Sequence, residues 1–459
     1  MQFTLPKKVL YIVNTLWEHG YAAYIVGGGG GGWFCAAYIV GGCVRDMLCG
    51  KTPSDWDITT AAHPEAVMEL FEKTVPTGLK HGTVTVLKEG DAFEVTTFRL
   101  DGAYENHRCP ENVSFTADVT ADLARRDFTM NAMAYHPQTG LIDPFDGQKD
   151  IQAGIIRCVG EAAKRFDEDA LRMMRAVRFA AQTGFAVDDA ALAAIRKQSA
   201  LISAVSAERI RDELLKLLVS PRPEAICIMR ETGLLAHVLP EVDCCFDTPQ
   251  HIKYHVFNVG RHIVEVTRNI PPTAPLRLAA LLHDIGKPDK IFWDTDGITH
   301  FYGHDVRSAE LAEEVLTRLR LDNHTKDTVV QLVRWHDRPI AATKAAVRRA
   351  MNKLGKDLFL DLLLLKRADS YGQNPVFLEA RQQEYDRIEA LYREILEDGD
   401  ALSLSDLAVN GRDLTALGYR GKTVGEALNL ALGLVLAHPE QNKRDILLQK
   451  IQNNFSKPD

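Results

Sequence analysis

The sequence lacks the features that mark secreted, zinc-binding or membrane proteins. Its eight cysteines contain no Cys-x-x-Cys pair, and the adjacent Cys244 and Cys245 do not have zinc-site spacing. The first residues show no apolar run followed by a small-residue cleavage site. The longest apolar run, ALNLALGLVLA (residues 427–437), has the length of a buried helix and not of a membrane span. These absences predict a cytoplasmic protein with reduced thiols and no membrane contact.

An excess of basic charge is also absent. With 54 Lys and Arg against 62 Asp and Glu, the chain carries a net charge of −8. There is thus no global electrostatic attraction to a polyanion, and any nucleic-acid surface must be local. At 459 residues the chain is too long for one hydrophobic core, and its length predicts about two to four domains.

A seven-residue segment, AAYIVGG, occurs twice near the N-terminus, at residues 22–28 and 36–42, with a run of glycines at 27–32 between the copies. Both copies suit the same buried strand, and only one can occupy it. The second copy is continuous with Cys43–Asp46, which we expect to open a helix. We therefore predict that the second copy is in the sheet and that the first lies in a mobile, glycine-rich loop.

Two motifs after the second copy suit phosphate and metal binding. Gly41 and Gly42 form a tight turn between a strand and a helix, and a helix N-terminus presents free N–H groups to a phosphate. In SDWDITT, Asp55 and Asp57 alternate, so an extended strand directs both carboxylates to one face. Such a pair repels unless a divalent cation neutralises it, which favours Mg²⁺. The alternative is a solvent-facing edge strand.

A hairpin follows, with strands at residues 82–87 and 92–98 joined by a KEGD turn. Glu94 faces away from Phe93 and Val95. It is the natural third carboxylate beside the aspartates, and the alternative is an exposed strand glutamate.

Two arginine-rich segments come next. In RRDFT, Arg125 and Arg126 offer planar forks for phosphate, and Asp127 can orient a sugar hydroxyl or an arginine. The alternative is a surface ion-pair cluster.

The second segment, residues 168–178, is helical by pattern. Arg172, Arg175 and Arg178 are three apart, and Asp169 lies one turn before Arg172, so the four share a face. From the residues alone, this pattern is typical of a helix stabilised by acid–arginine pairs.

A set of histidines and aspartates recurs in the helical pattern from Thr248 to about Gly372. Its members, in the order H…HD…H…H…D, are His262, His283, Asp284, His304, His336 and Asp369. A single buried histidine is usually a satisfied core residue, but a set in this order favours a metal site. Imidazoles with carboxylates suit Zn, Mn, Ni or Fe rather than a purely hard Mg²⁺ site. His251 and His255 are alternatives to His262 as the first ligand.

The segments IVGGCVRDMLCGKTPSDWDITT, EVTTFR, RRDFTMNAMAY and FDEDALRMMRAVRF resemble, in order and spacing, the class II tRNA nucleotidyltransferases, which comprise bacterial CCA-adding enzymes and poly(A) polymerases. The resemblance implies an α+β fold with a small mixed-sheet, polymerase-beta-type nucleotidyltransferase head followed by an all-helical remainder. The implied domains are a head (1–155, with the duplicated segment), a helical neck (156–245), an HD-type body (246–375) and a helical tail (376–459).

The resemblance also implies an activity. The 3′ hydroxyl of tRNA would attack the α-phosphorus of CTP or ATP without a template, and pyrophosphate would leave. Asp55 and Asp57 would hold Mg²⁺. The residues implied to bind the nucleotide are Gly41, Gly42, Arg45, Asp46, Arg125, Arg126, Asp127, Asp169, Arg172, Arg175 and Arg178. Of these, Asp169 and Arg172 would present hydrogen-bonding edges to the incoming base.

The histidine set resembles the ligand order of the HD phosphohydrolase superfamily. By this resemblance His262, His283, Asp284 and Asp369 form a first metal site, and His304 and His336 are available for a second. The implied activity is that of a phosphatase or phosphodiesterase on RNA ends. A body that keeps the fold without the activity is the alternative.

The loop DGAYENHRCPENVSF (residues 101–115) departs from the family pattern, with Asn106 at an acidic place and Cys109 at a basic one. This loop is associated with the switch from adding C to adding A, so terminal specificity stays open.

In the tail, the resemblance implies a tRNA-binding surface, and a solvated helical surface is equally consistent with the residues. The basic residues concerned are Arg412, Arg420, Lys422, Lys443 and Arg444.

Three alternatives to CCA addition remain at this point. The first is a poly(A) polymerase, or an enzyme that adds only CC or only A. The second is a phosphohydrolase whose head only binds RNA, and the third is a non-catalytic RNA-binding protein. The sequence indicates no stable protein partner.

Overall fold

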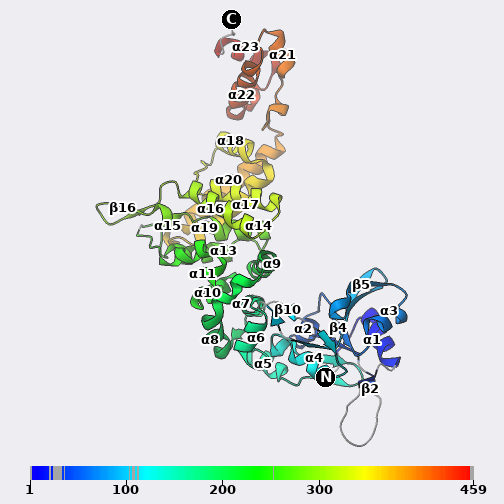
Figure 1. The fold of residues 1–459 in the computed structure, drawn as a ribbon. Helices are drawn as coiled ribbons and strands as arrows, with labels where there is room; N and C mark the ends of the chain where they lie inside the picture. Colours follow the sequence, from blue (N-terminus) through cyan, green and yellow to red (C-terminus); the bar gives the residue numbers. More distant parts are fainter. Residues whose placement is uncertain are drawn as a thin grey trace, which may run out of the picture. The chain divides into compact units, whose positions relative to one another are not determined.

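The computed structural model describes residues 3–19, 22–23, 34–35, 37–102, 104–105, 109–110, 113–251 and 253–454. The chain forms two compact units, Met1–Val238 and Leu239–Asp459 (Figure 1). The first combines a β-sheet with helices, and the second is almost entirely helical, which confirms the predicted α+β class. No helix within the described ranges is long and apolar enough to cross a membrane. The finer division into head, neck, body and tail stays a prediction.

A mixed sheet of seven strands, counted over the described residues, organises the first unit. Its strands in spatial order are β13 (Gly140–Ile142), β12 (Ala134–His136), β3 (Ala37–Val40), β4 (Ile58–Thr60), β7 (Asp91–Thr97), β6 (Thr83–Lys88) and β5 (Thr74–Gly78). Strands β6 and β7 form the predicted hairpin. β4 and β7 run parallel, and β3 is antiparallel to both β4 and β12. The parallel pair sets the ends of β4 and β7 side by side.

β3 is buried on both faces. Ala37 and Ile39 pack in a core with residues of α1 (Lys7–Glu18), whereas Tyr38 and Val40 belong to a second cluster on the opposite face. The alternation follows from the two-residue period of a strand. The prediction that the second AAYIVGG copy is in the sheet is therefore confirmed.

Of the first copy, only Ala22–Ala23 (β1) is described, and it pairs with β2 (Phe34–Cys35) outside the main sheet. Residues 24–33 lie outside the described residues, so the expectation of a mobile loop there stays a prediction.

Helices and short strands complete the first unit. The helices are α2 (Gly42–Leu48), α3 (Pro64–Leu70), α4 (Val119–Ala124), α5 (Gly147–Ala153), α6 (Ala162–Glu168), α7 (Leu171–Thr183), α8 (Asp189–Gln198), α9 (Ala207–Leu218), α10 (Ile226–Glu231) and α11 (Leu235–Val238). The short strands are β8 (Arg99–Asp101), β9 (Tyr104–Glu105), β10 (Cys109–Pro110), β11 (Val113–Phe115), β14 (Ile155–Ile156) and β15 (Ala186–Val187). Helices α7 and α9 pack against each other and carry the arginines discussed below.

The second unit is a helical assembly with one small hairpin among its described residues. Its helices are α12 (Pro240–Asp243), α13 (Val259–Arg268), α14 (Ala274–Leu282), α15 (Lys287–Lys290), α16 (His304–Arg318), α17 (Asn323–Trp335), α18 (Lys344–Leu354), α19 (Lys356–Tyr371), α20 (Leu378–Glu397), α21 (Gly411–Ala416), α22 (Lys422–Ala437) and α23 (Arg444–Asn454). The hairpin joins β16 (Phe292–Trp293) to β17 (Thr299–His300). The apolar run noted in the sequence is part of α22.

A chain lacking residues 22–35 tests the assignment of β3. We expect it to keep the sheet, because β3 and its partners are unchanged and the four residues left between α1 and β3 are a normal connection. The melting temperature should stay within about 4 °C of the full chain, which corresponds to roughly 1 kcal/mol. Ile39→Asp, which buries a charge in the sheet, should lower it far more. Unfolding of the shortened chain would contradict the assignment.

Candidate functional site

Three carboxylates gather at one end of β4 and β7. Ile58 lies opposite Val95 in the parallel pair, so Asp57 and Glu94 precede them at the same level. Burial, and then the neighbouring Asp55 carboxylate, raises the pKa of Asp57; Glu94 acts in the same direction and Arg126 opposes it. The ionised form of Asp57 is therefore disfavoured both by burial and by the neighbouring carboxylates. A divalent cation fits this environment.

Gly41 brings the start of α2 against these carboxylates. Its φ of +80° is a conformation that favours glycine. A Cβ at this position would lie 2.9 Å from an Arg126 guanidinium nitrogen and 3.9 Å from Asp57 Oδ2. The predicted glycine turn, arginine and aspartate are thus close together, with no room for a side chain between them.

Arg45 links α2 to the rest of the first unit. Its guanidinium donates hydrogen bonds to Asn131 Oδ1 at 2.9 Å and to Asp46 Oδ1 at 2.8 and 3.0 Å. It also lies over the ring of Phe179, 5.1 Å from the centroid. Gly41, Arg45 and Asp46 are thereby held beside α7.

The RRD segment is organised by a buried carboxylate that the sequence reasoning missed. Asp122, which is fully buried, lies 2.8 Å from Arg125 and 3.6 Å from Arg126. Asp127 accepts hydrogen bonds from Arg175 and from Asn131, at 2.7 and 3.3 Å. Burial alone would raise the pKa of Asp127, but Arg175 lowers it, so its carboxylate is ionised. The only feature of the sequence that could have indicated Asp122 is its position, three and four residues before Arg125 and Arg126.

The predicted helix over residues 168–178 is interrupted. α6 ends at Glu168, Asp169 is extended with φ −143°, and α7 begins at Leu171. The cause is local, because the Asp169 carboxylate accepts a hydrogen bond from the Leu171 N–H at 3.2 Å, a contact typical of a helix start. The expectation that Asp169 and Arg172 share one helix face is therefore wrong.

These residues are nevertheless anchored in one network. Arg209 of α9 holds the Asp169 carboxylate through two hydrogen bonds, at 2.8 and 3.2 Å. Arg172 donates to Glu168 at 2.7 Å and to the Arg125 carbonyl at 3.1 Å.

An acidic residue of α9 forms ion pairs with the other two arginines, Arg175 and Arg178. Glu213 lies 2.5 Å from Arg178 and 3.7 Å from Arg175. Arg209 and Glu213 are four apart on an amphipathic helix, and nothing in the sequence connected them to residues 168–178.

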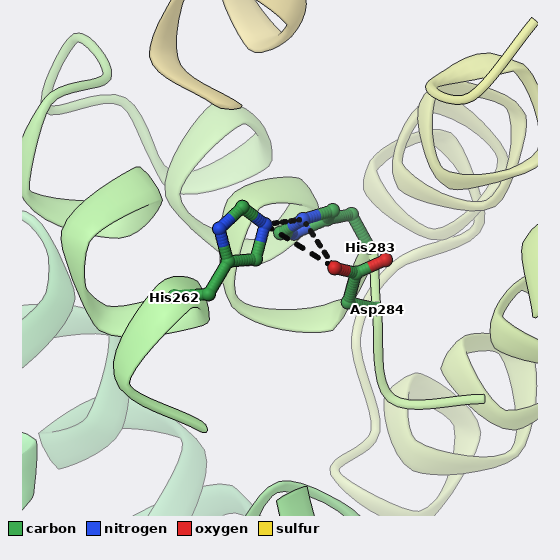
Figure 2. Close-up of side chains that lie close together, drawn as sticks. All are labelled: His262, His283 and Asp284. Atoms are coloured by element: carbon green, nitrogen blue, oxygen red, sulfur yellow. Dashed lines mark hydrogen bonds and ion pairs between the residues drawn. The ribbon is translucent and has the colours of Figure 1, made fainter. Parts of the chain in front are cut away.

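The histidine set of the second unit converges on Asp284. His262 comes from α13, and His283 and Asp284 directly follow α14 (Figure 2). The Nε2 atoms of His262 and His283 are 3.1 Å apart, and each is 3.2 Å from Asp284 Oδ2. Asp369 of α19 places Oδ1 3.0 Å from His262 Nε2. Four of the predicted residues thus meet at one point.

The remaining two meet on the other side of Asp284. Its Oδ1 lies 3.3 Å from His304 Nε2 and 3.4 Å from His336 Nε2. Asp284, His304 and His336 offer ligand atoms within 4.8 Å of one another, as do His262, His283 and Asp284. The structure therefore contains two adjacent groups that could hold metal ions and that share Asp284.

The histidines are oriented by main-chain carbonyls. The Nδ1 atoms of His262, His283, His304 and His336 face the carbonyl oxygens of Gly372, Ala280, Phe301 and Val333 at 2.8, 2.8, 2.8 and 2.6 Å. A carbonyl only accepts, so we infer that each Nδ1 carries the proton and each Nε2 has a free electron pair. The site then consists of acceptors facing one another, which fits a cation.

In the absence of a cation, the neighbouring carboxylates would instead draw a second proton onto His283. Burial by itself would lower the pKa of His283, but the Asp284 and Asp369 carboxylates raise it to about 10. Lys287, which the sequence reasoning did not select, is 2.6 Å from Asp284 Oδ2 and 2.8 Å from Gln250 Oε1. The carboxylates attract positive charge even without a metal.

The two alternative first ligands are not part of the groups. Burial, reinforced by Lys287, lowers the pKa of His255 to about 3, and its ring centroid is 5.1 Å from that of His262. His251 packs against Trp293 at 5.2 Å. His262 is therefore the better placed of the three.

The structure says less about two other sets of predicted residues, those of the 101–115 loop and the basic residues of the tail. Asn106 lies outside the described residues, and only the backbone of Cys109 is described. In the tail, Arg444 pairs with Asp413 at 2.8 Å and Lys422 with Glu426 at 3.4 Å. All five basic tail residues are exposed, and their role in tRNA binding stays a prediction.

Three family models match the chain. They are described as the poly A polymerase head domain (residues 37–157), a probable RNA and SrmB-binding site of polymerase A (184–246) and the HD domain (252–373). The first lies over the sheet and its carboxylates, and the third over the histidine groups.

Curated relatives are named CCA-adding enzyme. That of Geobacillus kaustophilus is 48% identical over 233 residues, which are 50% of this chain and 54% of the relative. That of Lactobacillus johnsonii is 47% identical over 203 residues, 44% and 51% of the two chains. The chain thus spans about half the length of the curated relatives it matches.

A solved structure matches over the whole length. The crystal structure of the Bacillus stearothermophilus CCA-adding enzyme in complex with CTP is 30% identical, covers 98% of both chains and has a TM-score of 0.74. By this similarity, together with the family models, the chain belongs to the family of the CCA-adding enzymes.

Proposed function

We propose that this protein adds CCA to the 3′ end of tRNA without a template, with CTP and ATP as substrates. The observation that carries the proposal is the carboxylate group Asp55, Asp57 and Glu94 next to the Gly41 turn and Arg126. The names of the relatives, one of them in complex with CTP, support it. The reaction would take place in the cytoplasm.

The chemistry needs alignment and charge neutralisation more than covalent help. Mg²⁺ held by Asp55 and Asp57 would neutralise charge on the phosphates and lower the pKa of the attacking hydroxyl. Glu94 adds a third carboxylate to this group. Arg126, which lies beside Gly41, and Arg45 would bind the triphosphate together with Gly42, Asp46 and Arg125. Pyrophosphate would leave from the part of the site formed by Arg45 and Arg126.

The base would be selected by fixed side chains. Asp169 and Arg172 are the proposed hydrogen-bonding edges, and Arg209 and Glu168 hold them in place. Asp127 and Glu213 would support the same region. Asp127 binds Arg175, and Glu213 binds both Arg175 and Arg178. A site with preset donors and acceptors penalises a base that leaves them unpaired.

The second unit supports an additional activity. We propose that the histidine groups hold one or two transition-metal ions (Ni, Mn, Zn or Fe) and hydrolyse phosphoesters at RNA ends. The acceptors that converge on Asp284 favour this over a purely structural role. His262, His283, Asp284 and Asp369 would hold one ion, and His304, His336 and Asp284 a second.

Incorporation assays on tRNA ending at the discriminator base, at C or at CC test the first proposal. With Mg²⁺, CTP alone should add two residues, and ATP should then add one and stop. Long tails from ATP alone would instead indicate a poly(A) polymerase. Asp55→Ala should reduce incorporation at least about 1,000-fold, because it removes a metal ligand. Glu69→Gln, an exposed acid of the same unit, is the matched control and should leave the rate unchanged.

Arg209→Ala tests whether the Asp169 pair sets base selection. Loss of a charged hydrogen-bond pair should lower kcat/KM for CTP by about 10- to 100-fold and raise the relative use of UTP and GTP. Arg211→Ala, on the same helix but paired with Asp212, should change neither. Equal losses with all four nucleotides would contradict a role in selection.

Phosphate release from 3′-phosphorylated RNA tests the second activity. Wild-type protein loaded separately with Ni, Mn, Zn or Fe should release phosphate with at least one of these metals, and a chelator should abolish the release. His283→Ala should lower it at least about 100-fold and leave nucleotide addition intact, because the ligand belongs to the second unit. His324→Ala removes an exposed histidine as the control. No release with any metal would contradict this activity.

A further inference from the structure

A hairpin next to the histidine groups carries exposed aromatic side chains. Phe292 and Trp293 of β16 are 57% and 48% exposed, and Tyr302, just after β17, is 75% exposed. Figure 1 shows this hairpin extending away from the neighbouring helices. We call Phe292, His300 and Tyr302 the aromatic platform. Apolar rings held in solvent suggest a binding surface.

The rings of the platform are already arranged for stacking. The His300 and Tyr302 rings are parallel, with centroids 5.4 Å apart and an interplanar angle of 7°. Phe292 lies 6.4 Å from His300 on the paired strand. The tyrosine hydroxyl and His300 Nδ1 are 3.3 Å apart.

Asp294 keeps the platform in place. Its carboxylate lies 2.8 Å from His300 Nε2. It also accepts hydrogen bonds from the backbone N–H groups of Asp296 and Ile298, at 3.0 and 2.9 Å. The side chain therefore closes the turn and fixes the imidazole at once. A preorganised platform loses little entropy when a ligand stacks on it.

Two of the three platform residues, His300 and Tyr302, share a cavity with the histidine groups. A cavity of about 300 Å³ is lined by His300, Phe301 and Tyr302 together with Asp284, His304 and His336. Phe301 joins the two parts, because its carbonyl orients His304 and its ring lies 5.3 Å from Lys287 Nζ. A phosphate bound to a cation at the histidine groups would thus have His300 and Tyr302 as its neighbours.

We propose that the aromatic platform stacks a nucleobase at the end of a single-stranded RNA whose terminal phosphate lies at the histidine groups. This rests on the proposed phosphohydrolase activity and names its substrate class. Stacking on aromatic rings tolerates any base, since each has a π-face. An RNA end fits better than a protein segment, because the cavity joins the stacked rings of His300 and Tyr302 to residues that could hold a cation, and such a cation would bind a phosphate.

Cross-linking locates the base directly. The RNA is a pentamer with a 3′-phosphate and 4-thiouridine as its last nucleotide, irradiated with the full-length protein. Trypsin cuts after Lys290 and Arg307, so the fragment 291–307 contains the whole platform. We expect adducts on this fragment. Tyr302→Ala should reduce their yield about 10-fold at subsaturating RNA, whereas Tyr302→Phe, which keeps the ring, should not.

Competition with unlabelled RNA isolates the contribution of the base. A 3′-phosphorylated pentamer should suppress the fragment 291–307 adduct about 10-fold better than the same RNA with an abasic last nucleotide. In Tyr302→Ala the two competitors should be equal. Uridine 3′-phosphate as a third competitor distinguishes an RNA chain from a mononucleotide, and it should compete more weakly than the pentamer.

The outcomes separate this proposal from the activity on which it rests. Phosphate release from the same RNA is measured in parallel. Adducts on the hairpin without release would contradict the hydrolase and support the platform. Release without hairpin adducts, adducts only in the first unit, or equal competition by abasic RNA would overturn the platform. In that case the exposed rings would be left as a protein-docking surface.

Discussion

The crowding of hydrogen-bond acceptors around Asp284 is the constraint on which the second unit depends. Four imidazoles and two carboxylates converge there, and the backbone already uses the Nδ1 proton of each histidine. Such an arrangement repels itself unless a cation or extra protons occupy the centre. The elements that supply it, α13, α14, α16, α17 and α19, must therefore be held together by their apolar contacts.

In the first unit, the carboxylates of Asp55 and Glu94 also lie close to that of Asp57 and disfavour its ionised form. Because burial and Asp55 raise the pKa of Asp57, its ionised form destabilises the fold as the pH rises through that pKa. A bound cation would remove this cost. The nearby arginines compensate only in part, since Arg126 is also shared with Asp122. In both units, function and stability are thus in opposition at the proposed metal sites.

Local patterns predicted much of this correctly. The buried strand of the second AAYIVGG copy, observed as Ala37–Val40, the hairpin with Glu94 and the helices of the second unit follow from short-range periodicity and turn residues. The prediction of a continuous helix through Asp169 was wrong. The Asp169 carboxylate accepts a hydrogen bond from the Leu171 N–H, and this local contact interrupts the helix despite the helical pattern. Asp122, Arg209, Glu213 and Lys287 were missed because their partners are set by packing between distant segments.

The sequence by itself determined the choice of the second AAYIVGG copy and which residues are candidates for holding metals, because chain continuity and side-chain chemistry are local properties, while the α+β class followed from the family resemblance of its motifs. Only the tertiary structure decided that Asp284 joins two groups, that Arg209 holds Asp169 and that His300 and Tyr302 line the cavity beside Asp284. These depend on the distances between residues that are tens of positions apart. No periodicity encodes such distances, since they result from how the helices and the sheet pack.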